Sequence, residues 1–214
     1  MRSTITYALV FICSVCGLPL SGVLFSDVRA NENEAKLQQH SHYAKRSGKT
    51  LKLTLASGKT LAFVDKPDPD GFAGVKYEFV DYVQPIDHFL VSALVHEGMA
   101  YALINRNNGK QFNIDEVPVF SPAFDRLITV SICDAFCPNR LQIWQIKPQP
   151  RLEWTFEPEQ YWASGSAKWR DGKTIEVTKE IADPAVSDPT KGKYVLKKEM
   201  LQLKLLPGGW AFTK

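Results

Sequence analysis

The chain has 214 residues, with 26 basic and 23 acidic side chains, so its formal net charge is only +3 at neutral pH. A chain so close to neutral is not strongly basic overall, which argues against a nucleic-acid-binding domain. Hydrophobic residues make up 44% of the chain, enough for a sizeable core in one domain.

The first thirty residues predict a signal peptide. Arg2 precedes an uncharged apolar run from Ala8 to Phe25, and Val28-Arg29-Ala30 offers a small-residue cleavage site at the end of residues 1–30. The alternative is an uncleaved anchor, because the run is just long enough to cross a bilayer. We expect cleavage, a periplasmic or secreted protein without stable membrane insertion, and no nucleic acid as partner.

Residues 31–48 are polar and lack apolar periodicity, which predicts a flexible polar arm. A single β-repeat domain is expected over residues 49–214. At its start, Leu51–Leu55 alternate apolar with polar residues, and Leu61 and Phe63 follow after a Gly-containing turn. This pattern predicts a β-hairpin.

The same order of features then recurs along the chain. An aromatic residue, a short polar turn and an apolar strand follow one another in Tyr82…Phe89, Phe120…Leu127 and Trp169…Ile175, with a fainter copy from Tyr43 to Leu51. Spacing near 40 residues is typical of propeller blades or stacked sheets.

The repeats predict an all-β fold of antiparallel sheet units, arranged as a propeller of about four blades. In such a propeller, Leu51–Leu55 would pair with Leu201–Leu205 and close the ring. The alternative is a β-sandwich built from the same units.

A disulfide is expected in the third unit. Cys133 and Cys137 are the cysteines left after signal removal, and neighbouring cysteines usually pair in an oxidising compartment. Pro138-Asn139 is a turn signal that makes so short a loop feasible. Free thiols and a redox or metal-binding pair are the alternatives, although the redox spacing of two intervening residues is absent.

The residue pattern predicts no catalytic, cofactor or metal site. His40 and His42 do not form a complete ligand set, and residues 65–71 lack the first and twelfth ligands of a calcium loop. Asp87, His88 and Ser92 have the residue types of a hydrolase, but no Gly-x-Ser-x-Gly elbow occurs.

Tyr161-Trp162 is the candidate ligand contact. The pair lies in an expected loop, where exposed aromatic side chains would favour binding. The alternative is packing between sheets, since aromatic side chains dominate β-sheet cores.

One segment resembles a known family. Residues 120–127, Phe-Ser-Pro-Ala-Phe-Asp-Arg-Leu, are similar to the turn that begins blades of WD40-like bacterial β-propellers, where an aromatic-Ser-Pro-Asp-Gly turn precedes an apolar strand. Leu141-Gln142-Ile143-Trp144 resembles the Trp-bearing strand of such blades. Ala123-Phe124 replaces the family's Asp-Gly. The resemblance is to small secreted bacterial proteins with WD40-like repeats, and it implies a propeller.

Two functions are compatible with these observations. The first is an exported, non-enzymatic β-repeat module that binds an envelope protein or glycan. The second is an envelope hydrolase or lyase with its site at the centre of the β-repeats, because propellers also host enzymes. An apolar centre would favour the module, and a funnel of converging polar side chains would favour the enzyme.

Overall fold

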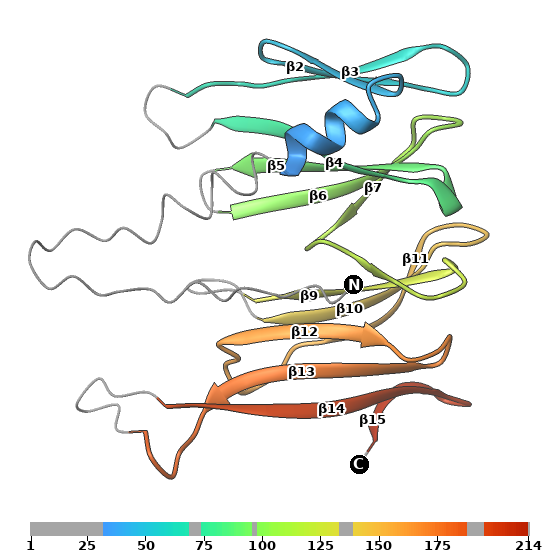
Figure 1. Ribbon diagram of the computed structural model, residues 1–214. Helices are drawn as coiled ribbons and strands as arrows, with labels where there is room; N and C mark the ends of the chain where they lie inside the picture. The colour runs from blue at the N-terminus through green and yellow to red at the C-terminus, as the bar shows by residue number, and fades with distance from the viewer. Residues whose placement is uncertain (1–31, 69–73, 96–97, 133–138, 188–194, 214) are drawn as a thin grey trace, which may run out of the picture.

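The computed structural model describes residues 32–68, 74–95, 98–132, 139–187 and 195–213. It confirms an all-β fold of repeated antiparallel units (Figure 1). The predicted signal peptide and both predicted disulfide cysteines, Cys133 and Cys137, lie outside the described residues. Among the residues described, no helix is long and apolar enough to span a membrane.

Four sheets, here named A to D, follow the chain as meanders. Sheet A contains β1 (Ala44–Ser47), β2 (Thr50–Thr54) and β3 (Thr60–Val64), and sheet B contains β4 (Val75–Val83), β5 (His88–Val95), β6 (Gly98–Asn105) and β7 (Gln111–Ile114). Sheet C contains β8 (Val119–Phe120), β9 (Arg126–Ser131), β10 (Arg140–Gln145) and β11 (Arg151–Phe156). Sheet D contains β12 (Ser164–Trp169), β13 (Thr174–Ala182), β14 (Leu196–Leu206) and β15 (Gly209–Thr213). A short 3-10 turn, η1 (Gln84–Ile86), joins β4 to β5.

The sheets stack face to face in chain order, from sheet A at the top of Figure 1 to sheet D at the bottom. Strands of the outer sheets A and D alternate apolar with polar side chains, whereas the middle sheets bury both faces: Phe89 and Leu90, consecutive in β5, lie in two different apolar layers. Three buried apolar layers result. Leu51 and Phe89 lie between sheets A and B, Leu103 and Leu127 between B and C, and Ile143 with its neighbours between C and D.

One backbone hydrogen bond recurs in all four sheets. A residue at the end of the third strand donates its N–H to a carbonyl oxygen in the turn between the first two strands. The bonds are Asp65 to Lys49 (2.8 Å), Arg106 to Asp87 (3.0 Å), Ile146 to Asp125 (2.7 Å) and Leu205 to Lys173 (2.8 Å). The sheets are therefore four copies of one unit.

The residue two positions after each acceptor is fully buried. These residues are Leu51, Phe89, Leu127 and Ile175, each with 0% exposure. Phe89 lies directly opposite Tyr82, Leu127 opposite Phe120, and Ile175 opposite Trp169. The three clear repeats seen in the sequence are thus cross-strand pairs, although Phe120 is only half-buried while Trp169 is buried.

The fainter repeat was placed wrongly. Leu51 lies opposite Arg46, not Tyr43, and the Tyr43 carbonyl instead accepts a bond from the Thr54 amide at 2.7 Å. Arg46 takes the aromatic position because its guanidinium pairs with Asp65 at 2.8 Å, at the end of β3. In sheet A, an ion-pairing residue therefore occupies the position that an aromatic ring occupies in the other three sheets.

The predicted ring closure is also wrong. Strand β2 pairs with β1 and β3, and β14 pairs with β13 and β15, so sheets A and D do not join. The sheets associate through their faces, and three consecutive apolar layers order them linearly. The repeated, propeller-like units therefore form an open stack. Its sheets pack face to face, as the two sheets of the alternative β-sandwich would.

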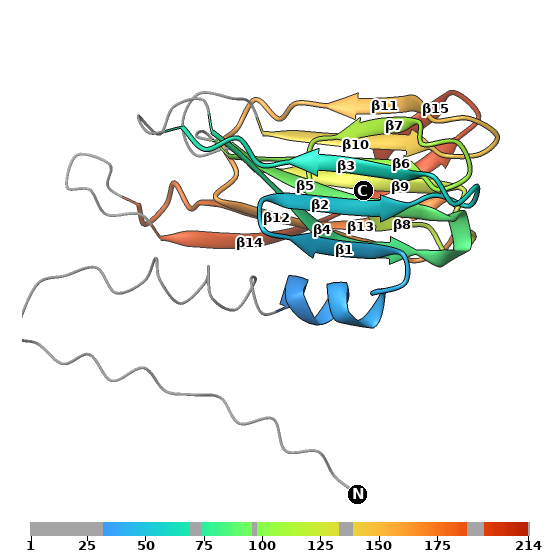
Figure 2. The same ribbon diagram turned by 90° about the horizontal axis from the view of Figure 1, so that it is seen from above.

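The expected polar arm is partly ordered. Residues 32–39 form a helix, and β1 begins within the segment that we expected to be irregular. Lys36 Nζ contacts Asp81 Oδ2 at 2.8 Å, Asn33 Nδ2 donates to Glu78 Oε2 at 2.8 Å, and Leu37 packs on the layer between sheets A and B. Seen from above, the helix lies beside the stack, not over sheet A (Figure 2).

Candidate ligand-binding surface

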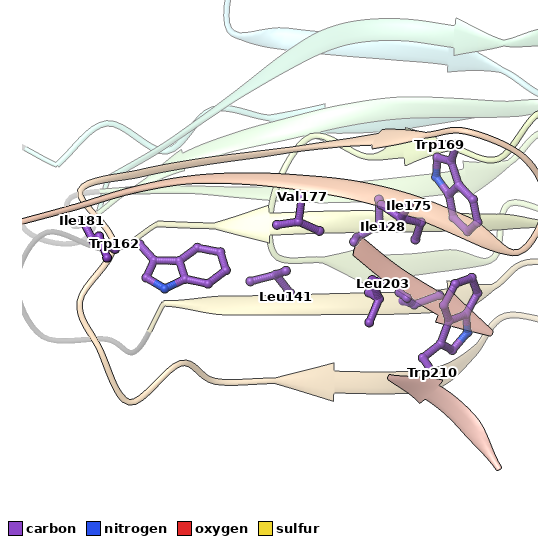
Figure 3. Packing of buried hydrophobic residues seen from close by; sticks show 10 residues of the cluster. Ile128, Leu141, Trp162, Trp169, Ile175, Val177, Ile181, Leu203 and Trp210 are labelled. Carbon is purple, nitrogen blue, oxygen red and sulfur yellow. The ribbon is translucent and has the colours of Figure 1, made fainter. Parts of the chain in front are cut away.

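The structure separates the two predicted contact residues. Trp162 is 1% exposed and lies in the layer between sheets C and D with Leu141 and Val177 (Figure 3). The Lys179 ammonium approaches its ring centroid at 5.4 Å. Trp162 is therefore a core residue, as the packing alternative requires, and it offers no surface to a ligand. Tyr161 is 55% exposed and is the member of the pair that a ligand can reach.

The hydrolase-type residues do not form a catalytic triad. His88 is buried, and its Nδ1 donates to the Ile86 carbonyl oxygen at 2.5 Å. Ser92 is 1% exposed, and its Oγ has no hydrogen-bond partner among the described residues. Burial lowers the pKa of His88 and outweighs the opposing effects of the Ile86 bond and Asp87, so the ring stays neutral near pH 7.

Asp87 is the centre of a dense polar cluster at the η1 turn, where it has a left-handed backbone conformation. Tyr82 Oη donates to its Oδ1 at 2.7 Å, Arg106 Nη1 contacts the same oxygen at 3.3 Å, and Asn107 Nδ2 donates to Oδ2 at 2.9 Å. Arg106 also lies over the Tyr43 ring, 4.7 Å from its centroid. The cluster joins sheet B to the segment that leads into sheet A.

The pKa shifts in this cluster indicate a structural role. Burial would raise the pKa of Asp87, but the bonds from Tyr82 and Arg106 outweigh it and the net shift is downward. Burial and the Asp87 carboxylate together raise the pKa of Tyr82. Asp87 thus stays ionised and Tyr82 stays protonated at neutral pH. Neither is tuned for proton transfer, and their polar atoms serve one another.

The equivalent turn of sheet C repeats this arrangement. Asp125 accepts a bond from Ser121 Oγ at 2.8 Å, and Arg126 joins Asp125 to Glu153, with 2.8 Å to each carboxylate. Trp210 Nε1 donates to Glu153 Oε2 at 3.2 Å and so ties sheet D to sheet C. Asp125 thus orders the turn within sheet C, and Glu153 of β11 makes the bond to sheet D. Within the described ranges, no group of three or more His, Cys, Asp or Glu could hold a metal ion.

The outer face of sheet A is different, because it is exposed and its charges are not neutralised. Since Leu51, Leu53 and Ala44 point into the core, alternation turns the intervening residues outward. The outward residues are Lys45, Ser47, Thr50, Lys52, Thr54, Thr60, Ala62 and Val64. We call this set the sheet A face.

Lys45 lies directly opposite Lys52 on the sheet A face, and both are exposed. Lys49 and Lys59 are also exposed, in the turns at the two ends of β2. The sequence from Ala44 to Val64 contains no acidic residue. In the described part of the chain, no carboxylate forms an ion pair with any of these four lysines. Like charges directly opposite in a sheet destabilise it, so this pair is unrelieved in the protein alone.

The outer face of sheet D lacks this feature. Lys168 lies opposite Glu176, and Lys198 lies opposite Glu180. Glu176 and Glu180 point outward because Ile175 and Val177, which alternate with Glu176 on β13, are buried in the core. Both ends of the stack present lysines, but only the sheet A face lacks opposing carboxylates.

A hollow of about 400 Å³ extends the basic character to the end of sheets A and B. Lys49, Lys66 and Lys76 line it, together with Asp65, Val75 and Leu94. Lys76 is paired with Glu78 at 2.7 Å and Asp65 with Arg46 at 2.8 Å, so Lys49 and Lys66 carry the net positive charge there.

Comparison with protein families, curated proteins and solved structures finds no match for this chain. The likeness of residues 120–127 to WD40-like repeats therefore stays a prediction. Sequence reasoning did not identify the sheet A face, although lysines at outward positions in a segment without acidic residues were a usable signal.

Proposed function

We propose that this protein is an exported, non-enzymatic binding module and that it binds an envelope component through the sheet A face. The observation that carries the proposal is the Lys45–Lys52 pair, two exposed like charges directly opposite on a sheet face that no described segment covers. Binding of an anionic group would pair these charges directly, whereas water and salt only screen their repulsion.

The centre of the stack supports a module over an enzyme. Apolar side chains fill the three layers between the sheets, where a site formed by converging units would have to lie. The polar clusters around Asp87 and Asp125 bond mainly to their own members. Export rests on the signal sequence in residues 1–30, and a periplasmic or secreted location follows from it.

The test measures retention of envelope protein, polysaccharide and lipid fractions on the immobilised exported protein. Three forms are compared: the parent, Lys45→Glu with Lys52→Glu, and the matched sheet D variant Lys168→Glu with Lys198→Glu. We expect the parent and the sheet D variant to retain one fraction that the sheet A variant loses. Circular dichroism melting controls for folding.

Two outcomes would contradict the proposal. Equal retention by both double variants would remove the sheet A face as the binding surface. Chemical conversion of a fraction, with turnover, would replace the module with the alternative of a hydrolase or lyase.

A further inference from the structure

We infer that the ligand of the sheet A face is an acidic polysaccharide, a linear polymer of carboxylate-bearing sugars. This inference rests on the proposed function and adds the chemical class of the ligand. Three features of the face support it: the spacing of the charges, the hydroxyl groups between them, and the absence of aromatic and broad apolar side chains among its outward residues.

The cations form a row. Lys45 and Lys52 are direct cross-strand neighbours, whose Cβ atoms are typically about 4.5–5.5 Å apart. Lys49 and Lys59 flank β2, a strand of five residues that spans about 17 Å at the usual rise. Lysines thus lie at the middle of β2 and at both of its ends, where Lys49 also lines the hollow beside sheet B. A polymer with repeated carboxylates can match such a row, whereas a single small anion would occupy one end of it.

Hydroxyl groups lie between the amines. Ser47 is directly opposite Thr50, and Thr54 is directly opposite Thr60, all on the sheet A face. Each hydroxyl can donate one hydrogen bond and accept others, as sugar hydroxyls do. The face therefore offers ion pairs for carboxylates and hydrogen bonds for the hydroxyls of the same polymer.

The other side chains of the sheet A face favour a sugar polymer over two other polyanions. Its outward residues include no aromatic side chain, and Val64 is the one large apolar group among them. Insertion at a membrane interface depends on a broad apolar face in addition to basic charge, and single-stranded nucleic acids are bound by stacking on aromatic rings. A flat face of lysines and hydroxyls lacks both features.

The test is a titration of the exported protein with polygalacturonate in low-salt buffer. Dextran serves as the uncharged polysaccharide, and phosphatidylglycerol vesicles serve as the anionic membrane. The parent should bind polygalacturonate, less tightly as ionic strength rises, because salt screens exposed charges. It should not bind dextran.

Charge-neutral variants test the location. Lys45→Gln with Lys52→Gln should weaken binding at least about tenfold, since two of the four face-associated cations are removed. Lys168→Gln with Lys198→Gln removes the same charge from sheet D and should change the affinity less than about twofold. Equal weakening by both variants would show a nonspecific charge effect and overturn the inference.

Two further outcomes would overturn it. Face-dependent binding to vesicles instead of polygalacturonate would assign the face to lipid. Failure to bind polygalacturonate, while an envelope fraction is still retained through Lys45 and Lys52, would reject the acidic polysaccharide and leave the proposed function standing. Loss of that retention as well would reject both.

Discussion

Lys45 and Lys52 lie directly opposite each other across β1 and β2, on the outer face of sheet A, which none of the described segments covers, at one end of the stack. On the face at the other end, Lys168 lies opposite Glu176. One end of the stack thus has a like-charge pair where the other has an opposite-charge pair. Stability measurements can test this difference independently of any ligand.

Charge reversal at these two positions should have opposite effects. Lys45→Glu replaces repulsion with attraction to Lys52, so it should raise the free energy of unfolding by about 0.5 kcal/mol or less. Lys168→Glu creates a like-charge pair with Glu176 and should lower it by a similar amount. Urea denaturation at low ionic strength measures both. Destabilisation by Lys45→Glu would mean that the lysines are not opposed as described.

Trp169 should be a major stabilising residue at the junction of sheets C and D. It is 8% exposed, and its Nε1 donates to the Val119 carbonyl oxygen at 2.9 Å. Trp169→Ala should cost about 3–5 kcal/mol. Phe120→Ala should cost less, about 2–3 kcal/mol, because that ring is only half-buried.

Lys173→Ala is the control for these two variants. Its side chain is exposed, and the repeated hydrogen bond uses its backbone carbonyl, so the cost should stay under about 0.5 kcal/mol. Chemical denaturation compares all three. If Trp169→Ala unfolded with the same free energy as the parent, the ring would not stabilise the contact between the two sheets.

The local part of the fold could be predicted from the sequence. Tyr82…Phe89, Phe120…Leu127 and Trp169…Ile175 were identifiable because each pair lies within one hairpin, where local alternation and turn residues set the register. The first copy was misplaced because Arg46, an ion-pairing residue, occupies the position that is aromatic elsewhere.

Long-range arrangement was harder to predict. Joining β2 to β14 or leaving both ends open gives the same local pattern, and the choice depends on how whole sheet faces pack. The burial of Trp162 has a similar cause, because its ring is covered by Leu141, Val177 and other residues of sheets C and D. The sheet A face was not predicted for a different reason. Only the strand registers show that its lysines lie opposite each other, whereas those of sheet D lie opposite glutamates.

Gly165 in β12 should not tolerate a side chain. A Cβ atom there would lie 2.9 Å from Val130 Cγ1 and 3.0 Å from Ile132 Cδ1, at the close approach of β12 to β9. Gly165→Ala should therefore cost about 1–3 kcal/mol through overpacking. Gly172→Ala, where a Cβ would meet nothing within 4 Å, is the matched control and should be near neutral. Thermal denaturation that ranks Gly172→Ala as the worse variant would contradict this packing.

His88 should make stability depend on pH in the mildly acidic range. Its folded-state pKa is lowered by burial, whereas the unfolded value is about 6.5. As pH falls below that value, the unfolded chain binds a proton that the folded chain does not, so stability declines until the folded pKa is reached. His88→Gln cannot titrate and should show a flatter profile.

Urea denaturation between about pH 5 and 7.5 measures the two profiles. The difference in unfolding free energy between parent and His88→Gln should shrink as the pH is lowered. A constant difference across this range would mean that His88 is solvated enough to titrate normally in the folded protein.

Lysine acetylation followed by mass spectrometry tests the central claim most directly. The exported protein is treated with a trace of acetylating reagent, free or bound to the envelope fraction that it retains, and the rate at each lysine is compared. We expect Lys45 and Lys52 to be modified several-fold more slowly in the bound protein, with Lys168 and Lys198 unchanged. Unchanged rates at Lys45 and Lys52, or protection confined to Lys168 and Lys198, would contradict a binding surface on sheet A.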